Sequence, residues 1–420
     1  MIYDFQSDQF WSGTALEKEE RRVFDLCNGC RRCFNLCPSF TELFNRIDDE
    51  RVDGDVDKLT ANDLNVVGDY CYQCKLCYNH CPYTPPHAWK IDFPRMMLRD
   101  KLVRTRRDGI SRQDRFLAKT DLIGHIGSWL APVFNWTNRN PLNRWLMEKM
   151  AGIHRRWTLP IYSFQTLSRW MKKRESSNGR GIPPKRKVAL FSTCSVNYSD
   201  VETGRALVQV LEKNQIEVVD GYKRCCGMPA LDGGDLESAL KNAEENVRFL
   251  SEKVRAGYDI VIPGPTCSYT IKQEYPLMLN TEDARLVAEH TFDSCEYLMK
   301  LHQDGALSTE FVSKLGTVSY QLSCHLKAQN LGYKSRDLLQ LAGARVQVVE
   351  RCSAVDGTWG MKREYHDLSV KLAQPLLKEV QEPAPEFIAT DCPLSALRIK
   401  QGTGRDALHP VRIFAKAYGL

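Results

Sequence analysis

Short apolar runs that reach a cysteine within a few residues recur through the second half of the chain. The runs are rich in β-branched residues and lead to Cys194, Cys225, Cys226, Cys267, Cys324, Cys352 and Cys392. Between them lie stretches such as residues 202–214 and 236–256, whose apolar positions are spaced three and four apart. That spacing is typical of one face of an amphipathic helix. Strands that alternate with helices predict parallel sheets covered by helices.

The spacing of these cysteines indicates an internal duplication. Successive cysteine positions are 31 and 42 residues apart in the first three runs, and 28 and 40 apart in the last three. In parallel α/β folds ligands gather beyond the carboxyl ends of the strands, which is where each run places its cysteine. Burial in the core is the competing interpretation for any single cysteine. It applies best to Cys295, which lies in an apparent helix outside the pattern.

The N-terminal part of the chain carries a different cysteine pattern. Residues 27–38 read C-x2-C-x2-C-x3-C-P, and residues 71–82 repeat that spacing. Two copies are the ligand pattern of a two-cluster bacterial ferredoxin, in which the fourth cysteine of each run binds the other cluster. The first cubane 4Fe–4S cluster would take Cys27, Cys30, Cys33 and Cys81, and the second would take Cys71, Cys74, Cys77 and Cys37. Structural zinc also binds C-x2-C pairs, but it does not require the third cysteine and the proline in duplicate.

Length and composition place these cysteines in a multidomain globular protein. The chain has 420 residues and 16 cysteines, and 26% of its residues are charged, so we expect two or three domains. Its longest apolar stretch, residues 122–134, is interrupted by His125 and is shorter than the roughly 20 residues of a membrane span. The first ten residues do not resemble a secretory signal. We therefore expect a cytoplasmic protein whose clustered cysteines bind metal rather than form disulfides.

A basic segment rich in tryptophan lies between the two cysteine-rich parts. Residues 86–187 have a balance of +16, against +6 for the whole chain, and hold six of its eight tryptophans. Two groups of apolar residues recur there at helical spacing: Leu142, Trp145, Leu146 and Met150, then Phe164, Leu167 and Trp170. Cationic helices with tryptophan on their apolar face lie in the membrane interface. Docking onto the rest of the protein is the main alternative, and nucleic-acid binding is disfavoured because no other feature supports it.

Several cysteine motifs of the second half resemble those of a known protein family. The stretches RCCGMP around Cys225, GPTCSYTIKQEYP around Cys267 and SCH at Cys324 resemble the CCG domains of one family of iron–sulfur oxidoreductases. That family includes the B subunit of heterodisulfide reductase and the C subunit of anaerobic glycerol-3-phosphate dehydrogenase. The order of modules is similar along nearly the whole chain, and the C-terminal motifs are most similar to a branch associated with rubrerythrin.

The resemblance implies a largely helical α+β ferredoxin-like module with two clusters, followed by duplicated α/β CCG domains with small parallel sheets. We place the ferredoxin-type domain at residues 1–100 and the basic helical segment with its linker at 101–187. The first CCG domain then covers 188–310, and a degenerate second one covers 311–420. Within the basic segment, residues 176–187 are rich in Gly, Pro and Ser, which predicts a linker.

The resemblance also implies a ligand set for an unusual non-cubane iron–sulfur cluster, supplied in full by Cys, Cys-Cys and C-x2-C. The first repeat keeps Cys194, Cys225, Cys226 and Cys267, with Thr270 at the fifth position. The second keeps Cys324, Cys352 and Cys392, with Ser353 and Ser395 at the other two positions. Serine is a poorer iron ligand because its hydroxyl stays protonated near neutral pH. His325, beside Cys324, is either a ligand or proton carrier or an ordinary hydrogen-bonded histidine.

Three arrangements of the two repeats stay open. The first repeat binds one cluster alone, or the two repeats pool their seven cysteines around one site. Otherwise the second repeat is structural, and residues 357–365 (GTWGMKREY) serve folding or docking. We expect one cluster, dominated by the first repeat.

The resulting functional hypothesis is an iron–sulfur electron-transfer subunit rather than a complete enzyme. No G-x-G-x-x-G follows a predicted strand, so we expect a partner chain, a flavin-containing dehydrogenase or reductase, to carry the flavin. Electrons would run through the two cubanes and the CCG-type cluster to quinone, or along the same path in the reverse direction. Residues 116–174 would lie on the inner face of the cell membrane, without contact to nucleic acid. The alternative is a soluble reductase of a disulfide or of a rubrerythrin-like peroxidase partner.

Overall fold

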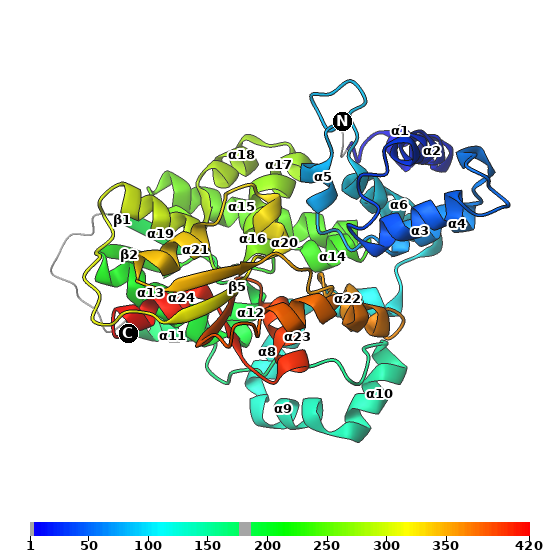
Figure 1. Cartoon of the computed structure of the whole chain (residues 1–420). Helices are drawn as coiled ribbons and strands as arrows, with labels where there is room; N and C mark the ends of the chain where they lie inside the picture. The colour runs from blue at the N-terminus through cyan, green and yellow to red at the C-terminus, as the bar shows by residue number, and fades with distance from the viewer. Residues whose placement is uncertain (1–3, 176–185) are drawn as a thin grey trace. The chain divides into compact units, whose positions relative to one another are not determined.

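The fold is taken from a computed structural model that describes residues 4–175 and 186–420 (Figure 1). Most of the linker predicted over residues 176–187 lies outside the described residues. The chain divides into two compact units, Met1–Ala118 with Pro229–Glu237, and Lys119–Met228 with Ser238–Leu420. The predicted boundary at residue 100 falls inside helix α6 (Phe93–Asp108), which continues unbroken through it with Leu98 and Leu102 buried.

The first unit is built from helices around an aromatic core. The helices are α1 (Asp8–Trp11), α2 (Gly13–Cys30), α3 (Pro38–Ile47), η1 (Val56–Lys58), α4 (Ala61–Asp69), α5 (Leu76–His80), α6 and α7 (Arg112–Leu117). Phe40 stacks on Phe93 with ring centroids 4.3 Å apart and on Phe44 at 6.1 Å. These rings bury apolar area from α3 and α6. The core thereby supports both cysteine runs, which lie at helix ends around it.

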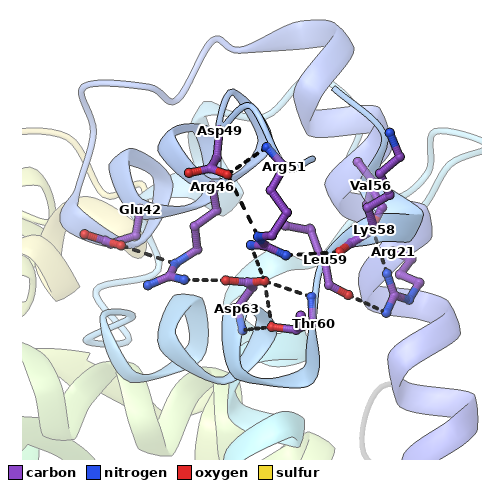
Figure 2. Close-up of polar contacts among 10 residues, drawn as sticks. All are labelled: Arg21, Glu42, Arg46, Asp49, Arg51, Val56, Lys58, Leu59, Thr60 and Asp63. Atoms are coloured by element: carbon purple, nitrogen blue, oxygen red, sulfur yellow. Dashed lines mark hydrogen bonds and ion pairs between the residues drawn. The ribbon is translucent and has the colours of Figure 1, made fainter. Parts of the chain in front are cut away.

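The long gap between the two cysteine runs is filled by α3, η1 and α4, and Asp63 ties this insert together (Figure 2). The buried Asp63 carboxylate accepts hydrogen bonds from Thr60, through its backbone N at 2.8 Å and its hydroxyl at 2.7 Å. It also pairs with Arg46, and with Arg51 at 2.9 Å. These bonds favour the charged form and hold the pKa of Asp63 well below its ordinary value although burial opposes them. The insert is therefore an ordered part of the ferredoxin-type domain.

The second unit contains two four-stranded sheets whose strands are all parallel. The first sheet has β1 (Arg186–Leu190), β2 (Ile216–Asp220), β3 (Asp259–Ile262) and β4 (Thr291–Asp293), in the order β2-β1-β3-β4. The second has β5 (Thr317–Gln321), β6 (Arg345–Val349), β7 (Phe387–Thr390) and β8 (Ala407–Leu408), in the order β6-β5-β7-β8. The equal order confirms the predicted duplicated α/β fold with small parallel sheets.

Helices cover these sheets and complete a shared core. Around the first sheet lie α12 (Thr193–Tyr198), α13 (Val201–Lys213), α15 (Leu236–Arg255), α16 (Pro265–Tyr269), η2 (Thr270–Glu274), α17 (Tyr275–Leu279), α18 (Glu282–Glu289) and α19 (Ser294–Gln303). The short helix α14 (Met228–Asp232) belongs almost entirely to the first unit. With the second sheet come α20 (Cys324–Ala328), α21 (Lys334–Leu341), η3 (Trp359–Met361), α22 (His366–Glu379), α23 (Pro393–Thr403) and α24 (Pro410–Ala417). One hydrophobic cluster joins Leu190 and Val261 of the first sheet to Tyr320 and Ala389 of the second. Cys295 lies buried in α19, as the sequence predicts.

The basic segment spans both units: its first part forms α6 and α7 of the first unit, and residues 119–175 form α8 (Thr120–Trp129), α9 (Ala131–Arg139), α10 (Pro141–Ala151) and α11 (Leu167–Glu175) in the second. Figure 1 shows α9 and α10 at the lower edge of this unit, away from both sheets. Its tryptophans divide into two groups: Trp129, Trp136 and Trp145 are 68%, 60% and 43% exposed, whereas Trp157 is 2% exposed and Trp170 packs against the core. Among the described residues, none of the helices combines the length and apolar character needed to cross a membrane.

Candidate iron–sulfur sites

The four cysteines predicted for the first cubane line one pocket of the first unit. Cys27 and Cys30 lie in the last turn of α2, Cys33 follows in the loop, and Cys81 follows α5. Arg31 ends α2 in the left-handed conformation with φ of 49°, which turns the chain back toward the pocket. Leu26, Phe40, Phe44 and Ile91 complete the lining with apolar surface. The geometry therefore brings together the set that the spacing proposes.

The chemistry of this pocket suits an iron–sulfur core that carries positive charge. Burial, with a further contribution from the neighbouring thiols, raises the pKa of Cys27 to about 12 and that of Cys33 to about 11. Four thiolates at such close quarters are unfavourable unless positive charge compensates them. The iron ions of a cubane cluster supply that charge, and the backbone N–H of Tyr83 donates to the Cys81 sulfur at 3.4 Å. The residues present therefore fit an iron–sulfur cluster.

The second predicted set gathers around the buried Cys77. Burial raises the pKa of Cys77 well above its ordinary value, and nearby Cys74, Cys71 and Cys37 raise it further. Lys75 occupies the same place in this run as Arg31 in the first, also in the left-handed conformation. Arg31 pairs with Asp48 at the surface, whereas Lys75 is buried and its Nζ donates to Gln73 at 2.7 Å. Gln73 Nε2 in turn donates to the Cys71 sulfur at 3.4 Å.

Four cysteines of the first CCG repeat converge beyond the carboxyl ends of β1, β2 and β3. Cys194 lies in α12, Cys225 and Cys226 in the loop after β2, and Cys267 in α16. The sulfur atoms of Cys226 and Cys267 are 3.3 Å apart. Hydrogen bonds from the Cys194 and Cys226 thiols lower the pKa of Cys225 well below its ordinary value, although burial opposes them. Four thiols gathered at one place, three of them buried, are a fitting ligand set for an iron–sulfur cluster.

The chain order of β1 and β3 explains this location. The sheet order reverses between these two strands, and ligands in open α/β sheets bind outside the strand ends at that switch point. Thr270, which stands at the fifth ligand position of the motif, donates its hydroxyl to the Thr266 carbonyl at 2.7 Å. The ligand positions of the first repeat therefore hold four thiols and one hydroxyl that is engaged in a backbone hydrogen bond.

Sequence reasoning missed Asp121, a residue of the basic segment that reaches this site. Its Oδ2 accepts from the backbone N–H of Cys225 at 2.7 Å, and its Oδ1 accepts from the Tyr222 hydroxyl at 2.5 Å. The Tyr198 hydroxyl lies 3.4 Å from the same Oδ1. Burial and then the neighbouring Cys225 raise the pKa of Asp121, while these hydrogen bonds act to lower it. The only local signal was an acidic residue at the start of the most apolar stretch of a basic segment.

The second repeat presents a different arrangement at the matching strand ends. Cys324 lies 4.0 Å from an oxygen of Asp356, and one ligand atom each of Cys324, His325 and Asp356 lie within 4.8 Å of one another. Burial raises the pKa of Cys392, with nearby Asp356 contributing. Cys352 is exposed and its sulfur accepts from the backbone N of Ala354 at 3.2 Å.

The serines at the two missing ligand positions bind each other. The Ser395 hydroxyl donates to Ser353 Oγ at 2.9 Å, so both side chains are engaged in a neutral hydrogen bond. His325 has a hydrogen-bond contact from Nδ1 to the Thr266 hydroxyl at 2.9 Å and stacks on Tyr269 with centroids 5.2 Å apart. The histidine thus lies between the two repeats, next to the residue that precedes Cys267.

The segment 357–365 of the second repeat holds part of the basic segment. Arg363 N donates to the Gly152 carbonyl at 2.8 Å, and His154 N donates to the Met361 carbonyl at 2.9 Å. His154 stacks on His366 with centroids 3.9 Å apart. This part of the basic segment therefore packs against the second repeat. Docking was one of the two roles, folding or docking, that were considered for residues 357–365.

Comparisons with known proteins identify one Fer4-like domain and two CCG domains in the chain. Residues 20–108 match the citrate utilization protein B Fer4-like domain, and residues 188–272 and 318–400 match the cysteine-rich CCG domain. The chain is 28% identical over 305 residues to the C subunit of anaerobic glycerol-3-phosphate dehydrogenase from Escherichia coli K12, covering 72% of this chain and 76% of that protein. It is 28% identical over 222 residues to lactate utilization protein A from Bacillus cytotoxicus, covering 49% of this chain and 87% of the relative.

Both domain types bear on the cofactor. A Fer4-like domain and cysteine-rich CCG domains indicate iron–sulfur clusters, which agrees with the cysteine geometry of both units. These matches confirm the expected resemblance to CCG-domain iron–sulfur proteins and to the C subunit of anaerobic glycerol-3-phosphate dehydrogenase, and they do not support the link to rubrerythrin. The chain thus carries a Fer4-like domain followed by two cysteine-rich CCG domains.

Proposed function

We propose that this protein is the iron–sulfur electron-transfer subunit of a membrane-associated dehydrogenase. Electrons enter from a flavin-containing dehydrogenase partner, pass through two cubane clusters, and leave through a CCG-type cluster in the first repeat to quinone. The protein lies on the inner face of the cell membrane through residues 116–174. A relative named as a subunit of anaerobic glycerol-3-phosphate dehydrogenase supports a dehydrogenase partner.

The observation that carries the proposal is the inverted amphipathic character of α8. Its small and polar side faces the protein, with Gly124, Gly127 and Ser128 buried, whereas Leu122, Ile126 and Trp129 on the other side are exposed. An ordinary surface helix of a globular protein turns its apolar stripe toward the core. The exposed stripe therefore has a use outside the folded chain, and a lipid surface suits it.

The exposed stripe continues beyond α8. Large apolar residues that remain exposed over α8–α10 and the following loop are Leu122, Ile126, Trp129, Leu130, Val133, Trp136, Leu142, Trp145, Leu146, Met150, Ile161 and Phe164. Exposed cations of α8–α10 and that loop are Arg139, Lys149, Arg155 and Arg156. Apolar area with adjacent positive charge matches a bilayer that contains anionic lipid.

The same helix supports quinone as the electron acceptor. Asp121 of α8 accepts a hydrogen bond from Cys225, so one helix contributes both to the exposed apolar surface and to the surroundings of the CCG cysteines. A lipid-soluble quinone would reach the protein from that surface. Substrate oxidation belongs to the partner chain, and this chain is an oxidoreductase component.

The test is binding of the purified protein to vesicles with and without anionic lipid. Substituting Trp136 or Trp145 by alanine removes exposed indole area, so each variant should bind about tenfold more weakly. Trp170→Ala is the matched control, because Trp170 packs against the core and should not contribute. High salt should weaken binding of the wild-type protein, since exposed charges are screened.

Equal binding of Trp145→Ala and wild type, or no binding of the wild type, would contradict the membrane part of the proposal. Such a result favours the alternative, a soluble reductase that hands electrons to a disulfide or to a rubrerythrin-like peroxidase partner. A water-soluble quinone analogue tests the electron acceptor separately from the membrane. It should reoxidise the reduced protein, and the loss of the reduced-cluster signal measures that reaction.

A further inference from the structure

We propose that Asp121 is a positioning residue of the first CCG site, which holds the Cys225–Cys226 loop and makes the reduction potential of the cluster bound there more negative. The inference rests on the proposed function in one respect, that the first repeat binds a cluster. It assigns a role to a residue from outside the CCG domain, contributed by the basic segment.

The hydrogen bonds of Asp121 fix the loop that carries two of the four thiols. Oδ2 accepts from Cys225 N at 2.7 Å, while Oδ1 accepts from the Tyr222 hydroxyl at 2.5 Å and lies 3.4 Å from the Tyr198 hydroxyl. The first turn of α8 therefore contacts the backbone of a ligand residue, Cys225, and the hydroxyl of Tyr222, three residues before it.

Close packing determines where this carboxylate lies. A Cβ added at Gly124 would lie 2.2 Å from the Tyr198 ring, and one at Gly127 would lie 2.8 Å from the Tyr162 ring. Only glycine allows α8 to approach these tyrosines so closely. Asp121 lies in the first turn of α8, where the helix dipole favours a negative side chain. The close packing of α8 therefore fixes the position of this carboxylate.

Two effects of the carboxylate act on the potential in the same direction. Reduction adds a negative charge to the cluster, and a nearby carboxylate opposes that addition. Asp121 also accepts the Cys225 N–H, which would otherwise be available as a donor to cluster sulfur. Hydrogen bonds to the sulfur atoms and net charge are established determinants of iron–sulfur potentials. Removing the charge should therefore make the potential more positive.

The test compares three variants of the anaerobically purified full chain by iron content and by an EPR-monitored redox titration. Asp121→Asn keeps an oxygen that can accept from Cys225 and removes the charge, so the potential should shift to a more positive value at unchanged iron content. Tyr222→Phe removes a donor that partly neutralises Asp121, so the potential should shift to a more negative value. Asp200→Asn is the matched control, because that carboxylate bonds Thr203 instead, and its potential should equal that of the wild type.

The outcomes separate this inference from the proposed function. A third cluster in the wild type whose potential is unchanged in Asp121→Asn overturns the role of Asp121 alone. If Asp121→Asn loses iron, Tyr222→Phe decides, and a potential that is unchanged or more positive there overturns the proposal. A wild-type protein without a third cluster overturns the electron path of the proposed function, and the role of Asp121 with it.

Discussion

The two CCG repeats share one topology but differ at the strand ends where the family binds its cluster. Each has four parallel strands in the same order, and the order reverses at the same place. In the first repeat four thiols converge, with the sulfur atoms of Cys226 and Cys267 3.3 Å apart. In the second, Cys324 faces Asp356, and Ser353 and Ser395 bind each other. The fold has been kept while the ligand set has changed.

The fold and the cluster site therefore depend on different residues. The strands are held by buried apolar side chains such as Leu190 and Val261 in the first repeat and Val318 and Ala389 in the second. The ligand positions lie in loops and short helices beyond the strand ends, outside that core. Exchanging cysteine for serine there leaves the packing of the sheet unchanged, which is why function resides in a site carried by a fold.

The surroundings of the two sites differ as well as the ligands. The first site receives Asp121 from the basic segment, with Tyr222 and Tyr198 on the same carboxylate. The second repeat instead uses residues 357–365 to dock residues 152–154 of that segment. One repeat thus contacts the basic segment at its cysteines, and the other contacts it through a structural surface.

The largest expected effect comes from removing one ligand in each repeat. Cys226→Ser should lower the iron content from about 12 to about 8 atoms per chain, on the arithmetic of four-iron clusters. Cys352→Ser is the matched change in the second repeat and should leave iron unchanged, because that cysteine is exposed. Iron and acid-labile sulfide analysis measures both. Equal loss in the two variants would indicate a shared site and contradict the proposed difference between the repeats.

A smaller effect should follow from restoring the two missing ligands of the second repeat. Ser353→Cys together with Ser395→Cys replaces a hydroxyl pair by two thiols, and we expect up to about four additional iron atoms per chain after reconstitution. Thr270→Cys in the first repeat is the control and should leave iron unchanged, because four thiols already converge there. If the double variant binds no additional iron, the missing thiols alone do not explain the difference, and Asp356 becomes the next residue to change.

The smallest effect concerns the pH dependence of the second repeat. Burial, and then the neighbouring His154, lower the pKa of His366 to about 4. The unfolded chain takes up this proton near pH 6.5, so His366 makes the free energy of unfolding fall as pH drops from about 6.5 to 4, by about 2 kcal/mol. Urea unfolding should therefore show that His366→Gln has a flatter pH profile than the wild type. Identical slopes in wild type and His366→Gln would show that the buried histidine does not contribute to the pH dependence.

Much of the fold was predictable because local pattern and core packing agree. The β-branched runs become β1, β2, β3, β5, β6 and β7, and the periodic stretches at 202–214 and 236–256 become α13 and α15. The two short strands β4 and β8 were not predicted, since two or three residues carry no periodicity. A domain boundary was predicted at residue 100, but α6 continues through that position and is buried on both sides of it.

The basic segment shows the limit of a helical pattern. Leu142, Trp145, Leu146 and Met150 are all exposed. In the second group Phe164 is exposed, whereas Leu167 is buried and Trp170 packs against the core. Both groups have the same spacing and similar composition in the sequence. Periodicity identifies an apolar stripe but does not say what covers it, because the covering surface comes from residues far away in the chain.

The two cysteine runs, the order of the domains and the duplicated strands can all be read from the amino-acid sequence. Those features depend on spacing and on periodicity within short windows, where local chemistry is sufficient. Only the tertiary structure decided that Asp121 reaches Cys225, 104 residues further along the chain, and that Ser353 binds Ser395. These contacts depend on how helices pack against strand ends, and no short stretch of sequence encodes a distance between residues so far apart.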